Sequence, residues 1–311
     1  MRTKHRLIGA YLLSLSLSLG ASAVFAADAL QLPGRDFKDG YVEAGGFRLH
    51  YKEGGRSDAP VLISLPGSAG LEMSRAKDLL ISKYRIIEIN PPGWGDDPEL
   101  TREMEQEEIG KILGLAANKL VTGSYHVLGT SMGGGNALWL AYHYPQRVKS
   151  LVLEGGMAPL RRSDLTNPLI ERAEVRKRLE AGQSPVGPPP GAQPPPGAAA
   201  AYPTPQVNPA KPWATREYTG KQMTQRFRMM KWVQTDIGSD QLFAKVRDAG
   251  FPVLGLLGDK DNIIKPSVAE YYRQVLPKAR FVLIPGGGHD LQNTATDAFV
   301  KEVTQFYAQI P

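Results

Sequence analysis

Short apolar runs alternate with longer amphipathic stretches along most of this chain. The apolar runs lie at residues 47–51, 61–65, 84–90, 125–128, 148–153, 253–257 and 280–284. Runs of this length are typical of strands that are buried on both faces of a sheet. Between them, amphipathic periodicity predicts helices at residues 71–82, 102–120 and 136–144, after Pro266, and at 291–307. This alternation predicts an α/β fold with a mostly parallel sheet covered by helices on both faces.

One apolar run leads into a motif that carries chemistry. Gly129-Thr-Ser-Met-Gly133 stands between the run at 125–128 and the helical pattern at 136–144. A Gly-x-Ser-x-Gly motif in this context is typical of a nucleophile elbow, a sharp strand-to-helix turn that exposes its serine. The flanking glycines fit where a side chain would collide with the neighbouring chain. Ser131 is therefore the predicted nucleophile, which needs a base, an acid and donors for an oxyanion.

His289 is the candidate base, because it follows a strand pattern and the glycine run Gly286-Gly-Gly288. The other four histidines lie either in the N-terminal leader or within strand and helix patterns, where packing or surface roles are expected. They are His5, His50, His126 and His143. Between Ser131 and His289, the apolar run at 253–257 ends in acids, so the three groups follow one another as Ser, Asp, His. This order is the one found in hydrolases with a nucleophile elbow.

Three carboxylates compete for the acid that orients the histidine. Asp259 and Asp261 both follow the run at 253–257, and Glu154 follows the run at 148–153, whose end is expected to face the same site. For the oxyanion, the run at 61–65 leads into Pro66-Gly67-Ser68. The backbone N–H groups of Ser68 and Met132 are the predicted oxyanion donors.

At this point the chain resembles the α/β-hydrolase family, from about Gly46 to the C-terminus with a gap across 158–239. Besides the elbow, Pro92-Gly-Trp-Gly95 is similar to the turn after the fourth strand of the family, and Tyr144-Pro-Gln-Arg-Val148 to the segment before its sixth strand. The resemblance implies a helical cap inserted after the sixth strand. The family's Gly-x-x-Asp spacing, counted from Gly258, favours Asp261 over Asp259 as the acid.

The expected organisation is a catalytic core interrupted by the cap. The core covers residues 27–156 and 250–311, and the cap covers 157–249 with helical patterns at 165–181 and 214–235. Within the cap, residues 184–212 are rich in Pro, Gly and Ala, which predicts an extended or disordered linker. Large apolar side chains of the cap either pack onto the core or line an apolar pocket over Ser131. The pocket candidates are Trp94, Met157, Phe227 and Met230.

The first residues predict export. A basic start is followed by an apolar run at 7–19 and by small residues up to Ala26, which is typical of a secretory signal peptide cleaved after Ala26. The apolar run is shorter than a membrane-spanning helix requires, so stable membrane insertion is not expected. The chain has no cysteine, which excludes a lipid anchor of the bacterial lipoprotein type. A periplasmic or secreted location follows as an expectation.

Composition narrows the choice of function. With 311 residues, of which 42% are hydrophobic, the chain can bury a sizeable core. The formal charge of +6 falls by three when Arg2, Lys4 and Arg6 leave with the leader, so nucleic acid is not an expected partner. The histidines show no metal-ligand spacing, and neither a metal nor a cofactor is predicted.

The sequence thus favours an exported serine hydrolase that cleaves small or medium carboxylic esters. A lactonase, a carbon–carbon bond hydrolase or a proline-type aminopeptidase could use the same triad, and a non-catalytic binding protein on this scaffold is a further alternative.

Overall fold

The computed structural model describes most of the predicted core. The described residues are 33–94, 102, 104–156, 160–161, 230–231, 233–234, 239–264 and 268–310. The predicted signal peptide at 1–26, the linker at 184–212 and most of the cap lie outside them. All seven apolar runs that predict strands lie inside them.

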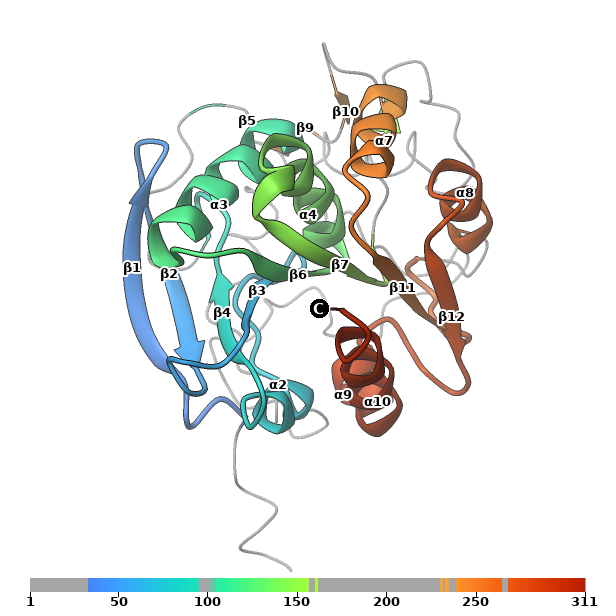
Figure 1. Ribbon diagram of the computed structural model, residues 1–311, viewed down its shortest axis with the longest axis horizontal. Helices are drawn as coiled ribbons and strands as arrows, with labels where there is room; N and C mark the ends of the chain where they lie inside the picture. Colours follow the sequence, from blue (N-terminus) through green and yellow to red (C-terminus); the bar gives the residue numbers. More distant parts are fainter. Residues whose placement is uncertain are drawn as a thin grey trace, which may run out of the picture. The chain divides into compact units, whose positions relative to one another are not determined.

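An eight-stranded sheet forms the centre of the fold (Figure 1). Neighbouring strands follow the order β1 (Lys38–Ala44), β2 (Phe47–Gly54), β4 (Arg85–Ile89), β3 (Val61–Leu65), β6 (Tyr125–Thr130), β7 (Val148–Glu154), β11 (Val253–Gly258) and β12 (Arg280–Ile284). The pairs β1–β2 and β2–β4 are antiparallel, and all other neighbours are parallel. The predicted mostly parallel sheet is therefore confirmed, with an antiparallel edge at its N-terminal strands.

Helices cover both faces of this sheet (Figure 1). One face carries α3 (Gln106–Leu120), α4 (Met132–His143), α7 (Ser239–Asp248) and α8 (Val268–Val275), and the other carries α2 (Arg75–Leu80), α9 (Leu291–Thr294) and α10 (Thr296–Tyr307). A 3₁₀ turn at Pro145–Arg147 leads from α4 into β7. Because side chains alternate along a strand, the strands in the middle of the sheet supply both layers of the core.

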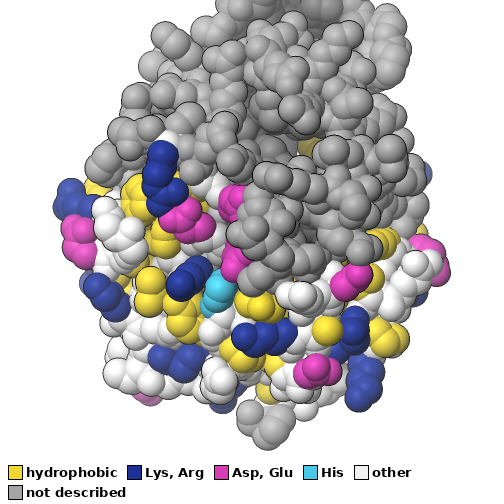
Figure 2. Space-filling model, turned by 90° about the horizontal axis from the view of Figure 1, so that it is seen from above, with side chains coloured by type: hydrophobic (Ala, Val, Ile, Leu, Met, Phe, Trp, Pro, Cys, Tyr) yellow, Lys and Arg dark blue, Asp and Glu magenta, His cyan; other side chains and the backbone are white. Residues whose placement is uncertain are grey.

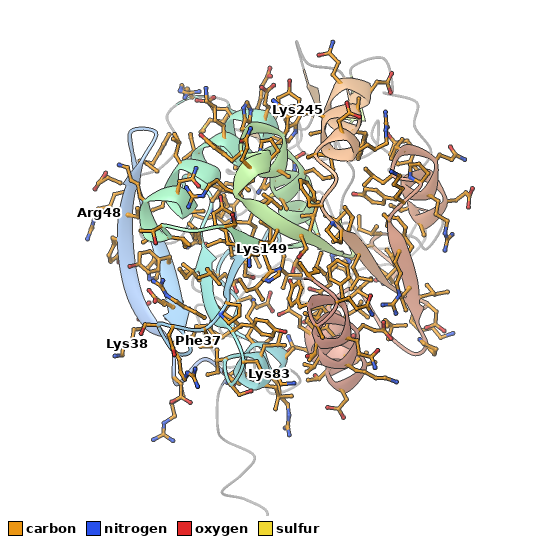
Figure 3. All side chains as sticks on the ribbon, in the orientation of Figure 1. Phe37, Lys38, Arg48, Lys83, Lys149 and Lys245 are labelled. Atoms are coloured by element: carbon orange, nitrogen blue, oxygen red, sulfur yellow. The ribbon has the colours of Figure 1, made fainter. Side chains whose placement is uncertain are left out.

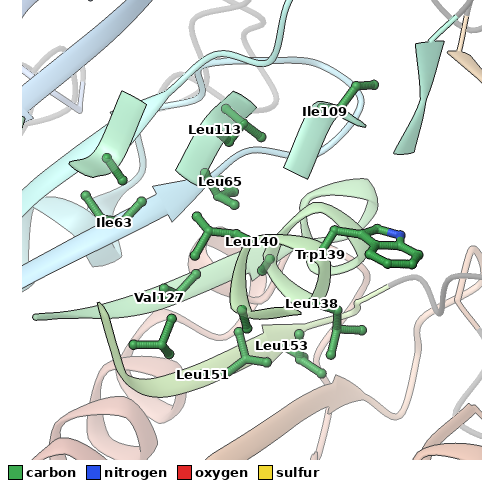
Figure 4. Packing of buried hydrophobic residues seen from close by; sticks show 14 of the residues in the cluster. Ile63, Leu65, Ile109, Leu113, Val127, Leu138, Trp139, Leu140, Leu151 and Leu153 are labelled. Atoms are coloured by element: carbon green, nitrogen blue, oxygen red, sulfur yellow. The ribbon is translucent and has the colours of Figure 1, made fainter. Parts of the chain in front are cut away.

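The core clusters follow this alternation residue by residue. On β6 and β7, Val127 and Leu151 pack in the cluster of α3 and α4, whereas Leu128 and Val152 pack in the cluster of α2 and α10. Figure 4 shows Val127 and Leu151 beneath Leu140 of α4. Because β6, β7 and β11 are parallel, their carboxyl ends lie at the same edge of the sheet.

The last part of the predicted cap packs onto the core. Leu242, Phe243 and Val246 of α7 are buried in the cluster that also holds α3 and α4. Lys245 lies on α7 (Figure 3). Its Nζ atom is 4.3 Å from the centre of the Tyr142 ring on α4, a cation–π contact between the two helices. The α7 helix, which lies in the predicted cap, therefore packs against the core helices, and the boundary of the cap stays a prediction.

Two boundaries differ from the expected ones near the site. α4 begins at Met132, directly after the serine, although three glycines follow. They are needed for space: a Cβ on Gly133 would lie 2.1 Å from the carbonyl oxygen of Leu65, and one on Gly135 would lie 2.3 Å from the side chain of Gln106. The predicted helix at 291–307 is divided at Ala295, whose backbone leaves the helical region (φ −144°, ψ 46°).

Strands also occur where none was expected. β1 was not predicted, because its sequence, Lys-Asp-Gly-Tyr-Val-Glu-Ala, is polar on its exposed face. The helical pattern at 214–235 is wrong at its end, where β9 (Met230–Lys231) pairs with β5 (Met104–Glu105) and β10 (Val233–Gln234) pairs with β8 (Leu160–Arg161). At these residues, pairing with distant segments prevails over local periodicity.

Candidate active site

Ser131 lies at the sharp turn between β6 and α4. Its backbone has φ 52° and ψ −118°, and it is the one residue other than glycine with a positive φ among those the structure describes. Such a conformation costs about 1–3 kcal/mol and persists only where the surroundings enforce it. Here Gly129 and Gly133 allow the close approach, since a Cβ on Gly129 would lie 2.4 Å from the Gly133 carbonyl oxygen. The N–H of Ser131 donates to the carbonyl oxygen of Glu154 at 2.9 Å.

The loop after β3 runs beside this serine. A Cβ built on Gly67 would lie 3.3 Å from the Ser131 Cβ and 3.9 Å from its Oγ. The next residue, Ser68, has its carbonyl oxygen bound by the indole N–H of Trp94 at 3.0 Å. This bond fixes the plane of the peptide that follows Ser68. The loop therefore brings the backbone at Gly67 next to the nucleophile, one residue before Ser68. Met132 supplies the first N–H of α4, a group without an intrahelical acceptor in any helix.

Side chains at the end of β4 hold the far part of the same loop. Asn90 accepts the N–H of Leu71 at 2.8 Å, and Glu88 accepts the N–H of Glu72 at 3.1 Å. Glu88 also forms an ion pair with the ammonium of Lys77, and both side chains are almost completely buried. A buried ion pair adds little net stability, because removing both charges from water costs about as much as their attraction returns. Here the same carboxylate also binds the loop, so the pair keeps Glu88 in position for that contact.

Asp261 and His289 are brought together by the loops after β11 and β12. The Nδ1 atom of His289 lies 2.9 Å from Oδ2 of Asp261, whose side chain is completely buried, while that of His289 is 19% exposed. The other oxygen of Asp261 accepts the N–H groups of Ile263 and Ile264 at 2.8 and 2.9 Å. Asp259 instead binds the N–H of Gly286 at 2.7 Å, so it holds the loop after β12. Geometry thus favours Asp261 as the group that orients the imidazole.

The imidazole ring of His289 packs over the end of β7. A Cβ on Gly155 would lie 3.2 Å from Nδ1 of the ring, a tight contact, and the φ of 50° at this residue also favours glycine. Gly155 directly follows Glu154, whose carbonyl oxygen receives the N–H of Ser131. His289 and Ser131 therefore each contact the chain at the end of β7, His289 at Gly155 and Ser131 at the preceding Glu154.

Glu154, the third candidate acid, makes other contacts. Its carboxylate is completely buried and binds Thr130 and Gln292. Burial, with a smaller contribution from the negative charge of Asp290, raises the pKa of Glu154 to about 7, although its hydrogen bonds work in the opposite direction. Sequence reasoning named Glu154 but missed Gln292 and Thr130, since no spacing links residues more than 130 positions apart.

The predicted pocket residues have different positions. Trp94 is completely buried and its indole N–H is bound to Ser68, as described above. Met157 and Phe227 lie outside the described residues. Met230 lies in β9, paired with Met104 of β5. The roles of these four residues in a substrate pocket stay predictions, as do those of Ser68 and Met132 in an oxyanion hole.

Within the described part of the chain, no three His, Asp or Glu side chains are grouped in a way that could hold a metal ion. No helix within the described ranges has the length and apolar character needed to cross a membrane. Figure 2 shows that Lys and Arg side chains on one visible face are interspersed with acidic and apolar ones.

The order of the sheet, the strained serine and the Asp261–His289 pair together point to one family. Residues 61–296 match the family model of the alpha/beta hydrolase fold. The chain belongs to this family. A curated relative, the 2-hydroxy-6-oxononadienedioate/2-hydroxy-6-oxononatrienedioate hydrolase of Escherichia coli O139:H28, is 34% identical over 115 residues. That match covers 35% of this chain and 40% of the relative.

Solved structures agree on the fold. A hydrolase from Pseudomonas aeruginosa superposes with a TM-score of 0.62 at 21% identity, covering 87% of this chain and 98% of the other. A carboxylesterase from Bacillus subtilis superposes with a TM-score of 0.59 at 15% identity, covering 90% and 95%. These superpositions support the α/β-hydrolase fold. At such low sequence identity they do not identify the substrate, which has to be inferred from the chemistry of the site.

Proposed function

We propose that this chain is a serine hydrolase that cleaves small or medium carboxylic esters through an acyl-enzyme. Two observations carry the proposal: the strained turn at Ser131, and the hydrogen-bonded pair of Asp261 and His289 at the carboxyl ends of neighbouring strands. Backbone strain marks functional sites, and a buried carboxylate on Nδ1 leaves Nε2 of the ring to act as the base. No cofactor takes part in the proposed reaction.

The reaction would proceed in two halves. In the first, Nε2 of His289 takes the proton of the Ser131 hydroxyl while Oγ attacks the ester carbonyl, and the N–H groups of Ser68 and Met132 stabilise the oxyanion. The tetrahedral intermediate then expels the alcohol, which receives the proton from His289, and the acyl group stays on Ser131. In the second half, water attacks the acyl-enzyme with His289 again as base, which releases the acid and restores the serine. Asp261 holds the ring and stabilises its charged form.

Carbon–carbon bond hydrolysis is the second candidate, and the 34% identity to the Escherichia coli relative favours it. A carbon–carbon bond next to a carbonyl can be cleaved by the same set of groups, because the nucleophile, the base and the oxyanion donors act on the carbonyl in both cases. What differs is the leaving group, which must be stabilised as a carbanion or enol rather than as an alcohol.

Export is part of the proposal. The basic start, the apolar run and the small residues before Ala26 support a signal peptide and hence a periplasmic or secreted enzyme. Fractionation of cells that express the full chain, with N-terminal sequencing of the product, tests this part. A product that keeps residues 1–26 and stays in the cytosolic fraction contradicts it.

The central experiment compares substrates on one enzyme preparation. Nitrophenyl esters of increasing acyl length, lactones, aminoacyl amides and a 2-hydroxy-6-oxo acid are assayed side by side, with Ser131→Ala as the matched control. Turnover of short esters that disappears in Ser131→Ala supports the ester proposal, and preferred turnover of the oxo acid supports the second candidate. A wild-type protein that neither turns over any of them nor reacts with a fluorophosphonate is a binding protein on this scaffold, and the proposal is then wrong.

A further inference from the structure

The side chain of Gln292 forms three hydrogen bonds near the site. It is 3% exposed and lies on α9, three residues after His289. Its Nε2 donates to Oε2 of Glu154 at 2.6 Å and to the hydroxyl of Thr130 at 3.1 Å. Its Oε1 accepts the hydroxyl of Ser74 at 2.8 Å. Both amide hydrogens and the carbonyl of this one side chain therefore have partners.

The partners of Gln292 lie next to the parts of the proposed machinery. Thr130 directly precedes Ser131. Ser74 caps α2, at the end of the loop that begins with Gly67 and Ser68, and also accepts the N–H of Lys77. Gln292 itself belongs to the segment that carries His289. A single amide thus connects the nucleophile turn, the predicted oxyanion loop and the histidine loop.

Glu154 holds this amide in place. Its Oε1 accepts the backbone N–H of Gln292 at 3.1 Å, and its Oε2 accepts the hydroxyl of Thr130 at 2.8 Å. Its own carbonyl oxygen receives the N–H of Ser131 at 2.9 Å. The side chain of Glu154 therefore fixes α9, and its backbone fixes the nucleophile turn, from one position at the end of a buried strand.

We propose that Gln292 and Glu154 are positioning residues that set the distance of His289 and the oxyanion loop from Ser131. This inference rests on the proposed serine hydrolase function. Its physical reason is that α9 has only four residues and follows a glycine-rich loop. Leu291 anchors α9 in the core, and the hydrogen bonds that tie α9 to β6, β7 and α2 come from Gln292. A shift of about 1 Å between reacting groups can lower the rate about 100-fold, and buried hydrogen bonds to rigid strands prevent such shifts.

The hydrogen-bonded contact between Gln292 and Glu154 is called the bridge below. The test uses the full chain with substitutions of each of these two residues. Gln292→Leu removes the amide at similar volume, and Glu154→Gln keeps the shape but places two amides face to face. We expect kcat on a short nitrophenyl ester to fall about 10- to 100-fold in each, while KM changes less than about threefold, because the substrate's own contacts remain. The double variant Glu154→Gln/Gln292→Glu restores an amide–carboxylate pair and should recover most of the lost kcat.

Ser150→Ala is the matched control. Ser150 is completely buried and lies on the same strand as Glu154, near the start of β7 rather than at its end. The substitution removes a hydrogen bond of 2.8 Å to His126. Its kcat should stay within about twofold of wild type even where its melting temperature falls as far as that of the bridge variants. All rates are expressed per site that reacts with a fluorophosphonate, so that unfolded protein does not count.

The outcomes separate this inference from the proposed function. If Ser131→Ala abolishes turnover and labelling but the bridge variants keep wild-type kcat per labelled site, the positioning role is wrong and the hydrolase proposal stands. The same conclusion follows if kcat falls equally in Ser150→Ala, or if the exchanged pair recovers nothing while each single variant folds. If Ser131→Ala itself keeps full activity, the proposed function is wrong.

Discussion

Strands β6 and β7 carry two buried polar pairs, and the comparison between them distinguishes structure from function. His126 pairs in register with Ser150 near the start of these strands, and Thr130 pairs with Glu154 at their end. Each pair is joined by a side-chain hydrogen bond of 2.8 Å. Burial favours the neutral form in both: it lowers the pKa of His126 to about 4 and raises that of Glu154 to about 7.

The surroundings of the two pairs differ. The ring of His126 packs against Tyr307, with ring centres 4.4 Å apart, and edge-on against Tyr84. Glu154 binds Gln292 and, through its backbone, the strained Ser131. A shifted pKa is therefore a poor guide to function taken alone, since both ends of the sheet have one. What distinguishes the site is the connection of a buried group to a strained residue and to loops from distant parts of the sequence.

The largest expected effect is that of replacing Ser131 at the site end of β6. Ser131→Ala should lower kcat by at least about 1,000-fold, because the nucleophile is lost, and should change the free energy of unfolding by less than about 1 kcal/mol. Ester hydrolysis and urea unfolding measure the two quantities. Fluorophosphonate labelling that persists in Ser131→Ala would contradict the assignment.

The next prediction concerns the two acids after β11. Asp261→Asn should lower kcat about 100- to 10,000-fold, because Asn can hold His289 in the wrong tautomer. Asp259→Asn should cost less than about tenfold, since Asp259 binds only the Gly286 N–H. Steady-state kinetics of the two variants at one pH make the comparison. The reverse ranking would show that the acid is misassigned.

The elements that could be predicted from the sequence are those whose signal is local. Apolar runs marked the strands of the sheet, and glycines around Ser131 marked the turn. The spacing from Gly258 that the family resemblance implies favoured Asp261, which the structure places 2.9 Å from His289. In each case the residues that decide the structure are neighbours in the chain.

The parts that could not be predicted depend on distant contacts. β1 is recognisable only through its pairing with β2, and β9 only through β5. Gln292 lies 138 residues from Glu154, and nothing in its local sequence distinguishes it from a surface residue of an amphipathic helix. The break at Ala295, which separates α9 from α10, likewise has no glycine or proline that would predict it.

A third prediction concerns how the free energy of unfolding depends on the protonation of His126 at acid pH. A histidine whose pKa is lowered by folding contributes stability above the pKa of the unfolded chain and loses it as pH falls towards its folded pKa. From pH 6.5 to 4 the wild type should therefore lose about 2–3 kcal/mol through this group. His126→Asn keeps a partner for Ser150 and does not titrate, so the difference in unfolding free energy between the two proteins should change by that amount. An unchanged difference would contradict the shift.

The smallest expected effect concerns Glu154 and has the opposite sign. A carboxyl group whose pKa is raised by folding contributes stability below the pKa of the unfolded chain and loses it as pH rises through the folded value, which is about 7 here. Between pH 6 and 8 the wild type should lose about 1 kcal/mol through Glu154. Glu154→Gln lacks this titration, so whatever its stability at pH 6, it should gain about 1 kcal/mol relative to wild type by pH 8.

Urea unfolding of Glu154→Gln, His126→Asn and wild type at each pH makes this measurement. His126→Asn is the matched control, since its difference from wild type should be flat above pH 7, where a histidine at the other end of the strands no longer titrates. A Glu154→Gln difference that is equally flat from pH 6 to 8 would mean that the carboxyl group is ionised throughout. The two buried pairs would then differ in their ionisation as well as in their neighbours, and the bridge to Gln292 would hold a permanent charge beside the site.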